Sequence, residues 1–572
     1  MNLTELICRR AARADAVAFD VFDTLIKRDT ATPTDLFRLR GEAFYTARIE
    51  AEREARAVKG GEVTLAEIYA RPCLAGYDPA QECAAELAAC VPYRPVLDAV
   101  QQLRRQGKKL YYISDMYLPQ AQVDAMLRRC GYPAFDGGLV SSTYGVQKRS
   151  GKLFRQFLHE TELDARQVLF IGDSWRADVA GAALAGIPAW HLPTPPQPAD
   201  AVAAFAENRL PALQPGGQAL GFSVLGPLAV AFCKWLHDRR AAHPAARLYF
   251  LARDMYLMRE VYGLLYPEEK TEYLQVSRRS LAPAFLAEGE YACVLAALPR
   301  QRLTGAQLAA YCGTVCPDSE AESVFDLKTP DTEPLYAFLA KLPRPETADA
   351  VMGYLQSKQL RAGDILVDIG SGGTTQLLLE KLLGTELHGM QLSADDRLRS
   401  RFSASRTEVF LFDGAPAPRI YWAGQPLLER LLSQDVGATL SYTKTPAGFR
   451  VNTAAQPAEP LVAELQRGVL YFAQEWQKSV LNGQAIEPQR AIAPFLQLVE
   501  SPTALQARLL GDLTVEDGGI YPLAAPRSAG YYLTHPAAAG RDLSTARWKI
   551  GFVKRLAPLP LPYGKIYQKL KK

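Results

Sequence analysis

Residues 19–25 read FDVFDTL, and Asp20 in this stretch is the last residue of the short apolar segment Ala16–Asp20. An apolar segment of this kind predicts a buried β-strand. In open α/β sheets, ligands bind beyond the carboxyl ends of the strands, so a carboxylate at a strand end faces the binding crevice. We therefore predict that Asp20 lies in a functional site at the edge of a parallel sheet.

Three further motifs follow in an order that suits phosphoryl transfer through an aspartate. Ser114 ends the strand-like segment KLYYIS and can donate a hydrogen bond to a phosphoryl oxygen. Lys148 precedes a helical segment that contains Phe154, and it supplies a positive charge. Residues 172–178 read GDSWRAD after the strand-like segment VLFIG, and their two aspartates are suitable ligands for Mg²⁺. These motifs predict a site that binds a phosphate group and a metal ion.

The four motifs resemble those of the haloacid dehalogenase superfamily over roughly a third of the chain. The resemblance implies that Asp20 is the nucleophile and forms an aspartyl-phosphate. Thr24 is then the helper in the same loop, while Ser114 and Lys148 stabilise charge on the phosphoryl oxygens. Lys152 is an alternative to Lys148, but the spacing of Lys148 from the following helix matches the family better.

The resemblance also implies a magnesium site formed by Asp20, Asp173 and Asp178. Asp178 has two open roles, because it can serve the metal or orient Lys148. The long interval between Asp20 and Ser114 accommodates a helical cap, which we expect at about residues 30–93.

The first motif departs from the pattern of the superfamily's phosphatases at one position. These enzymes carry a second aspartate two residues after the nucleophile as general acid and base, and this chain has Phe22 there. Asp23 is the neighbouring candidate for that role. Dehalogenases and phosphonate-cleaving relatives also lack the second aspartate, but dehalogenases have lost the metal-binding acid that Asp173 retains. We therefore expect a phosphohydrolase, with a weakly active or non-catalytic binding or scaffold protein as the alternative.

The length of 572 residues predicts two or three domains. We expect a Rossmann-like α/β hydrolase domain with its cap over residues 1–195, followed by a linker and helical connection over 196–245. Strand-like and helical segments then predict a second Rossmann-like α/β domain with a helical insertion over 246–432. The remaining residues, 433–572, are expected to be mostly helical and to end in a basic tail.

The second half contains the strand-like segment Asp364–Ile369, which runs directly into a glycine-rich loop. Residues 368–375, which include the end of that segment, read DIGSGGTT. Backbone N–H groups of such a loop can bind phosphate, so Gly370, Gly372, Gly373 and Thr374 form a candidate phosphate loop. A tight structural turn is an equally good interpretation. A transferase activity in this half is a further alternative.

The combined motifs of both halves are similar to those of large bacterial hydrolase-like proteins associated with glycosyltransferases and surface-polysaccharide synthesis. That resemblance implies a phosphosugar or nucleotide-sugar substrate and glycosyltransferase partners.

Composition and charge indicate a cytoplasmic protein. The net charge of +4 is small for this length and gives no indication of nucleic-acid binding. Nine cysteines without a Cys-x-x-Cys pair fit a reducing compartment. We expect no signal peptide, because charged residues interrupt the first residues. The apolar run Gly221–Leu236 is shorter than a transmembrane helix requires, so we expect it to be a buried helix. The tail Arg547–Lys572 mixes aromatic and basic residues; it is expected to be a solvated extension, with contact to anionic membranes as the alternative.

Overall fold

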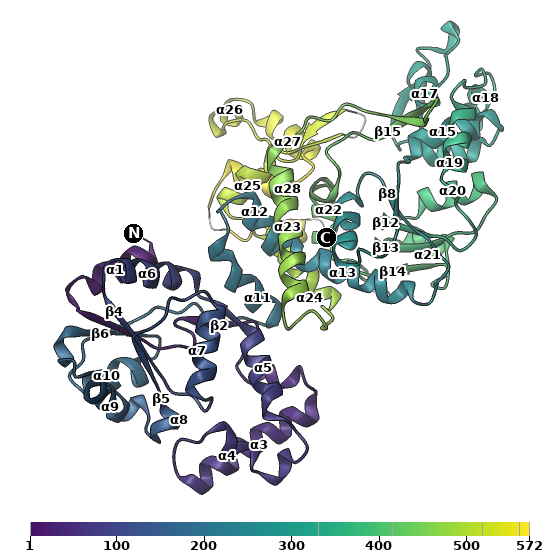
Figure 1. The fold of residues 1–572 in the computed structure, drawn as a ribbon. Coiled ribbons are helices and arrows are strands. Elements are labelled where there is room, and N and C mark those ends of the chain that lie inside the picture. The colour runs from purple at the N-terminus through teal and green to yellow at the C-terminus, as the bar shows by residue number, and fades with distance from the viewer. Residues whose placement is uncertain (1, 330, 414–415, 517–518, 560, 571–572) are drawn as a thin grey trace. The chain divides into compact units, whose positions relative to one another are not determined.

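The computed structural model describes residues 2–329, 331–413, 416–516, 519–559 and 561–570. The chain forms two compact units (Figure 1). The first contains residues 1–214 together with 475–484, and the second contains residues 215–474 together with 485–572.

The first unit is built on a five-stranded sheet in which all strands are parallel. Its strand order is β5-β4-β1-β6-β7. The strands are β1 (Ala16–Phe19), β4 (Lys109–Ser114), β5 (Gly137–Val140), β6 (Val168–Gly172) and β7 (Ala189–His191). β1 lies at the centre between β4 and β6, so the predicted parallel α/β sheet around Asp20 is confirmed.

Helices cover both faces of this sheet because successive residues of β1 point to opposite sides. Val17 and Phe19 pack in one hydrophobic core, and Ala16 and Ala18 pack in another. The core around Val17 includes residues of α1 (Leu3–Arg10), α6 (Arg94–Arg105) and α7 (Gln120–Arg129). The core around Ala16 and Ala18 includes residues of α9 (Lys152–Thr161) and α10 (Gly181–Ala183).

A helical insertion separates β1 from β4. It leaves and rejoins the sheet domain through the antiparallel pair β2 (Ile26–Arg28) and β3 (Cys90–Pro92). Its helices form a group of their own beside the sheet (Figure 1). They are α2 (Asp35–Arg38), α3 (Glu42–Lys59), α4 (Leu65–Tyr69) and α5 (Pro79–Ala89).

The second unit contains another five-stranded parallel sheet, with the order β14-β13-β12-β8-β9. Its strands are β8 (Leu248–Leu251), β9 (Thr271–Leu274), β12 (Ile365–Ser371), β13 (His388–Ala394) and β14 (Thr407–Val409). The helices that follow these strands include α14 (Tyr256–Leu265), α20 (Thr374–Leu383), α21 (Asp396–Arg401) and α22 (Arg419–Leu432). The order of connections differs from that of the first sheet, so the two units are not copies of one topology.

A helical lobe is inserted between β9 and β12, and Figure 1 shows it beyond the edge of the sheet. It contains α15 (Arg278–Ala287), α16 (Tyr291–Ala297), α17 (Gly305–Tyr311), α18 (Glu333–Leu339) and α19 (Ala348–Ser357), together with the short strands β10 (Arg302–Thr304) and β11 (Val324–Asp326). The hairpin β15 (Thr439–Thr445) and β16 (Gly448–Thr453) packs on α15 and α19.

The apolar run predicted as a buried helix lies inside the second unit. Residues 217–240 form α12 (Gly217–Leu220), a turn of π-helix and α13 (Gly226–Arg240). Within the described parts of the chain, this is the one helical stretch long and apolar enough to cross a membrane, but 72% of its most apolar window is buried in the protein. A core helix of a soluble protein has the same properties.

The C-terminal part of the second unit is mainly helical. It comprises most of α23 (Pro460–Lys478), whose last four residues belong to the first unit, and the following elements: α24 (Pro488–Glu500), α25 (Ala504–Gly511), α26 (Ala529–Thr534), α27 (Pro536–Thr545), α28 (Lys549–Leu556), α29 (Tyr563–Leu570) and the hairpin β17 (Thr514–Glu516) and β18 (Ile520–Pro522). Trp548 and Phe552 of the basic aromatic segment are buried in this region. These two side chains are core residues rather than part of a solvated extension.

Candidate functional site

The four predicted motifs meet at the carboxyl edge of the first sheet. Asp20 directly follows β1, Asp173 directly follows β6, and Ser114 is the last residue of β4. In the sheet, β1 lies between β4 and β6. The chain passes from β1 to β4 towards one edge of the sheet and from β6 to β7 towards the other edge. Such a switch point forms the ligand crevice of open α/β sheets.

Lys148 reaches Asp20 from a tight turn, Lys148–Ser150, that precedes α9. Two glycines make this approach possible. A Cβ on Gly181 would lie 2.3 Å from the Lys148 carbonyl oxygen, and one on Gly172 would lie 2.3 Å from Oδ2 of Asp178. Glycine at these two positions therefore brings the third and fourth motifs into contact with each other.

The lysine connects two of the aspartates. Lys148 Nζ lies 2.5 Å from Oδ1 of Asp20 and 2.6 Å from Oδ1 of Asp178. Asp178 Oδ2 also accepts a hydrogen bond of 2.9 Å from the backbone N–H of Ser174. Asp178 thus contacts both Lys148 and the loop after β6, an arrangement compatible with the expectation that it orients Lys148.

Burial makes the charged forms of Asp20 and Asp173 unfavourable. Burial raises the pKa of Asp20 to about 8; Lys148 opposes the rise, and the neighbouring Asp178 and Asp173 add to it. Burial also raises the pKa of Asp173, with Asp178 and Asp23 contributing. Burial alone would lower the pKa of Lys148, but Asp20 and Asp178 outweigh it and keep the ammonium charged.

Two predicted hydroxyl groups have different surroundings. Thr24 Oγ1 lies 3.4 Å from Oδ2 of Asp20 and 3.4 Å from Oδ1 of Asp173. Ser114 is 1% exposed, and its Oγ has no hydrogen-bond partner among the described residues. A buried hydroxyl without a partner costs free energy, so this group is available for a ligand oxygen.

Asp23 differs from the other predicted residues in its surroundings. Its backbone is left-handed, with φ of +60°, and its side chain is 55% exposed and forms an ion pair of 3.4 Å with Lys27. The guanidinium of Arg28 lies over the ring of Phe22, and its central carbon is 4.1 Å from the centre of that ring. The position that carries an aspartate in related phosphatases therefore holds a side chain that packs against an arginine.

The three aspartates fit a hard divalent cation. One carboxylate oxygen from each of Asp20, Asp173 and Asp178 lies within 4.8 Å of the others. Lys148 balances only part of their negative charge, and Mg²⁺ prefers carboxylate ligands completed by water. Both oxygens of Asp178 have close partners, Lys148 and the Ser174 N–H. Oδ2 of Asp20 and Oδ1 of Asp173 have only the longer contacts of 3.4 Å with Thr24, so Asp20 and Asp173 are the carboxylates best placed to contact a metal directly.

A comparison with known families agrees with this geometry. The model of haloacid dehalogenase-like hydrolases matches residues 14–186. These residues form a haloacid dehalogenase-like hydrolase domain. No protein of curated function matched the sequence.

Solved structures similar to this hydrolase domain include phosphatases and dehalogenases. They include the HAD-hydrolase YfnB of Bacillus subtilis bound to magnesium, with 21% identity, a HAD phosphatase of Thermococcus onnurineus, with 18%, and a 2-haloacid dehalogenase of Pseudomonas syringae, with 22%. Each match covers 31% or 32% of this chain and 85% to 89% of the other, and each has a TM-score of 0.25.

Two acidic residues of the hydrolase domain were missed by the motif analysis. Asp115 accepts a hydrogen bond of 3.0 Å from the backbone N–H of Lys148, and it directly follows the motif residue Ser114. Glu62 comes from the helical insertion, is 4% exposed, and accepts hydrogen bonds from Ser141 and Gln147. Asp115 could have been found from its place in the second motif, whereas Glu62 carries no sequence signal.

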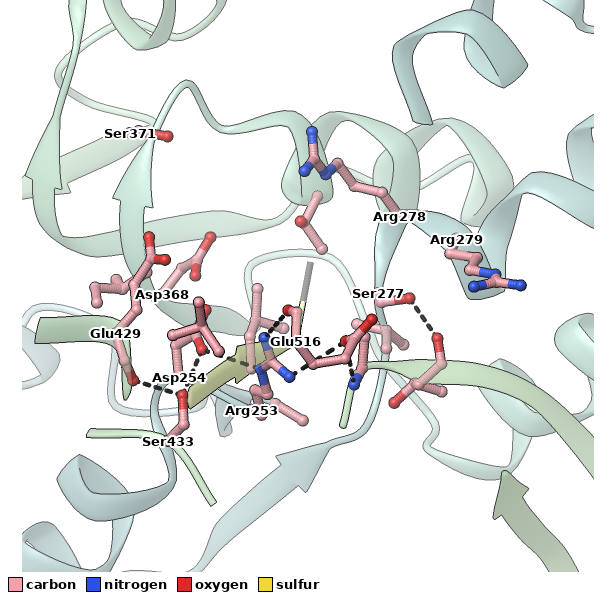
Figure 2. A pocket seen from close by; sticks show the side chains of 18 of the residues that line it. Arg253, Asp254, Ser277, Arg278, Arg279, Asp368, Ser371, Glu429, Ser433 and Glu516 are labelled. Atoms are coloured by element: carbon pink, nitrogen blue, oxygen red, sulfur yellow. Dashed lines mark hydrogen bonds and ion pairs between the residues drawn. The ribbon is translucent and has the colours of Figure 1, made fainter. Parts of the chain in front are cut away.

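The predicted phosphate loop lies in the second unit, away from these motifs in sequence. It runs from the end of β12 to the start of α20, and it lines a cavity of about 620 Å³, part of which Figure 2 shows. Gly370 lies in β12, Gly372 and Gly373 form the connection, and Thr374 begins α20. Gly370 has φ of +99°, and a Cβ there would lie 1.8 Å from the carbonyl oxygen of Ser393. Glycine is therefore required at position 370 because the backbone of β13 comes so close. This requirement is structural and agrees with the interpretation of the sequence as a tight turn.

Proposed function

We propose that the hydrolase domain is an Mg²⁺-dependent phosphohydrolase that acts through an aspartyl-phosphate on a small phosphorylated metabolite. One observation carries the proposal. Asp20, at the end of the central strand, is paired with Lys148 at 2.5 Å, and the neighbouring strand ends in Ser114, whose buried hydroxyl has no hydrogen-bond partner in the described part of the chain. A nucleophile, a cation and a hydrogen-bond donor are what a phosphoryl group requires.

The proposed reaction has two steps. A carboxylate oxygen of Asp20 forms a bond to phosphorus while the bond from phosphorus to the leaving oxygen breaks, and the leaving oxygen takes up a proton from solvent. Water then attacks phosphorus and loses a proton to solvent while the bond from phosphorus to the Asp20 oxygen breaks, which releases inorganic phosphate and restores Asp20. In both steps Lys148 and Ser114 hold the phosphoryl oxygens, and Thr24 positions Asp20 relative to Asp173. Mg²⁺ bound by Asp20 and Asp173 would neutralise the phosphate so that the anionic nucleophile can approach.

We propose a phosphosugar as the substrate class and the helical insertion as the part that selects it. The insertion contributes Glu62, which approaches the site through Ser141 and Gln147. Glu62 is buried and also accepts a hydrogen bond of 3.2 Å from Arg56 of α3. It therefore ties the insertion to the turn that holds Lys148, and this places the insertion beside the site.

A second candidate is a binding or scaffold protein whose hydrolase site turns over slowly or not at all. Two observations favour it: Phe22 is packed against Arg28, and the exposed Asp23 is paired with Lys27. General acid and base help contributes roughly 10²–10⁴-fold to such reactions, so its loss would leave a slow enzyme.

Phosphate release from phosphosugars, nucleotides and a chromogenic monoester, with and without Mg²⁺, distinguishes the two candidates. We expect metal-dependent release that Asp20→Asn abolishes and that Lys148→Met lowers by about 100-fold or more, because it removes the cation from the phosphoryl oxygens. Lys152→Met is the matched control, since Lys152 is exposed, and it should retain activity.

Release that is equal in the parent and in Asp20→Asn for every substrate would favour the scaffold protein. Equal losses in Lys148→Met and Lys152→Met would contradict the role assigned to Lys148.

A further inference from the structure

The second unit has a cavity at the equivalent place of its own sheet. β8 and β12 are neighbours, and the chain continues from β8 to β9 on one side and from β12 to β13 on the other. Their carboxyl ends form a switch point, where open parallel sheets bind ligands. The cavity of about 620 Å³ opens there, within the size range of small-molecule sites.

One side of the cavity is lined by hydrogen-bond acceptors from three elements. Asp254 follows β8, Asp368 belongs to β12 and Glu429 belongs to α22, and all three are half-buried. Asp254 accepts a hydrogen bond of 2.7 Å from Ser433. Figure 2 shows the three carboxyl groups gathered together.

Burial raises the pKa of Asp368 to about 7 and that of Glu429 to about 8, and in both cases Asp254 adds to the rise. In the described part of the chain, these three acids are not among the groups compact enough to hold a metal ion. Hydroxyl donors are the partners that suit such a group of carboxyl oxygens, since they satisfy the acceptors without adding charge.

Arginines lie at another side of the cavity. Arg278 and Arg279 are the first two residues of α15, and both line the cavity. Figure 2 shows them apart from the three acids. Arg278 is exposed and has no ion-pair partner among the residues that the structure describes. Its charge slightly opposes the rise in the pKa of Asp368. An exposed guanidinium at the mouth of a cavity is a suitable partner for a phosphate group.

The glycine-rich loop adds backbone donors to the cavity. The first turn of α20 has no side-chain cap, and Gly372 to Thr375 line the cavity. Beside the loop, Gln391 is 1% exposed, and its Oε1 has no hydrogen-bond partner within the described ranges. This oxygen lies 3.2 Å from the position of a Cβ on Gly370, so an unsatisfied buried acceptor faces the loop.

From this arrangement we infer that the cavity of the second unit is a separate ligand site for a molecule that joins a phosphate to a hydroxyl-rich group, the class of sugar phosphates and nucleotide sugars. The phosphate lies near Arg278, Arg279 and the loop, and the hydroxyl groups donate to Asp254, Asp368 and Glu429. An anion alone would leave the oxygens of the three acids without hydroxyl donors, and a neutral sugar would leave Arg278 without an anionic partner.

Isothermal titration calorimetry on the full chain tests this inference. The chain carries Asp20→Asn together with Lys148→Met, which weakens phosphate binding at the hydrolase site, and the probes are glucose 1-phosphate, UDP-glucose and inorganic phosphate. We expect both sugar-containing probes to bind. Arg278→Ala and Asp368→Asn should each raise their Kd about tenfold or more, because the first removes a donor to the phosphate and the second removes an acceptor for a hydroxyl group. Inorganic phosphate should bind at least about tenfold more weakly.

Arg344→Ala and Asp349→Asn are the matched controls, because these residues form an exposed ion pair in the same helical lobe and do not line the cavity. Tighter binding of UDP-glucose than of glucose 1-phosphate would identify nucleotide sugars as the ligands, and equal binding would identify sugar phosphates. Either result upholds the inference.

Three results would overturn it: no binding of either sugar probe, Kd values within twofold of the parent in both Arg278→Ala and Asp368→Asn, or equal affinity for inorganic phosphate. Arg278 is exposed, so its variant remains informative if Asp368→Asn does not fold. These measurements do not depend on turnover at Asp20, and failure of the phosphohydrolase proposal would leave them unaffected.

Discussion

Glu429 is a residue whose charge opposes the stability of its own unit. Burial has the largest effect on its pKa, which rises to about 8. Asp254 and Asp368 raise the pKa further, while the hydrogen bond from Gln425 and the charge of Arg253 lower it. The folded protein therefore holds the proton on Glu429 more tightly than the unfolded chain does. The stability linked to this proton is fully present below about pH 4.5 and is lost as the pH rises through 8.

Glu429→Gln should remove this pH-dependent loss. At pH 5 the variant and the parent should unfold at similar temperatures, because the carboxyl group is protonated in the folded parent. At pH 9 the variant should unfold at least about 2 °C higher, which corresponds to roughly 1 kcal/mol or less in a unit of this size. Scanning calorimetry at the two pH values measures the difference. A gap between variant and parent that stays constant from pH 5 to pH 9 would contradict the argument.

At the scale of one element, helix α3 depends on a buried ion pair within the helical insertion. Arg48 is fully buried and donates two hydrogen bonds to Glu82 of α5, at 2.7 and 2.9 Å. It also donates one of 3.0 Å to Glu52. Removing one partner of a buried pair leaves the other charge uncompensated, which costs about 3–5 kcal/mol.

Arg48→Met should therefore lower the unfolding temperature of the first unit by roughly 6 °C or more. Arg53 lies on the same helix and pairs with Glu50, but its side chain is 76% exposed. Arg53→Met should change the temperature by about 1–2 °C at most, because exposed ion pairs contribute little. Thermal unfolding of both variants, followed by circular dichroism, makes the comparison. Similar shifts in the two variants would show that the buried pair does not hold the insertion together.

The strands that the sequence predicts well are those with uninterrupted apolar character. KLYYIS and VLFIG have the predicted bounds as β4 and β6, because apolar side chains on both faces require burial on both faces. β13 was not predicted, since its sequence HGMQLSA contains polar residues that are nevertheless buried. Tyr421 donates a hydrogen bond of 2.7 Å to Ser393, and His388 lies 3.3 Å from Glu408. Such partners are distant in sequence, and only the folded chain reveals them.

The same distinction applies to the candidate site. Asp20, Lys148 and Asp178 could be grouped from their motifs because the carboxyl ends of parallel strands meet at one edge. Glu62 could not, because its contact with Ser141 depends on how the insertion folds back. The acids of the second cavity, Asp254 and Glu429, likewise come from separate elements whose meeting depends on the strand order.

At the scale of the whole molecule, the first unit is discontinuous in sequence. Residues 475–484 belong to it, although more than two hundred residues of the second unit precede them. Trp476 is 1% exposed, and its ring lies 5.1 Å from that of Phe205 in α11 (Ala201–Arg209). Glu475 lies 3.5 Å from Arg209 of the same helix. The C-terminal half of the sequence thus contributes a core side chain to the unit that carries Asp20.

Trp476→Ala should destabilise the first unit despite its distance from that unit in sequence. Truncating a buried tryptophan costs about 3–5 kcal/mol, and the loss should open α11 first, because Phe205 loses its ring partner. Hydrogen exchange followed by mass spectrometry should show faster exchange of residues 201–209 in this variant. Leu533→Ala, at a side chain that is 85% exposed, is the control and should leave exchange in α11 at the parent rate. Unchanged exchange in α11 of Trp476→Ala would mean that residues 1–214 are stable without this segment.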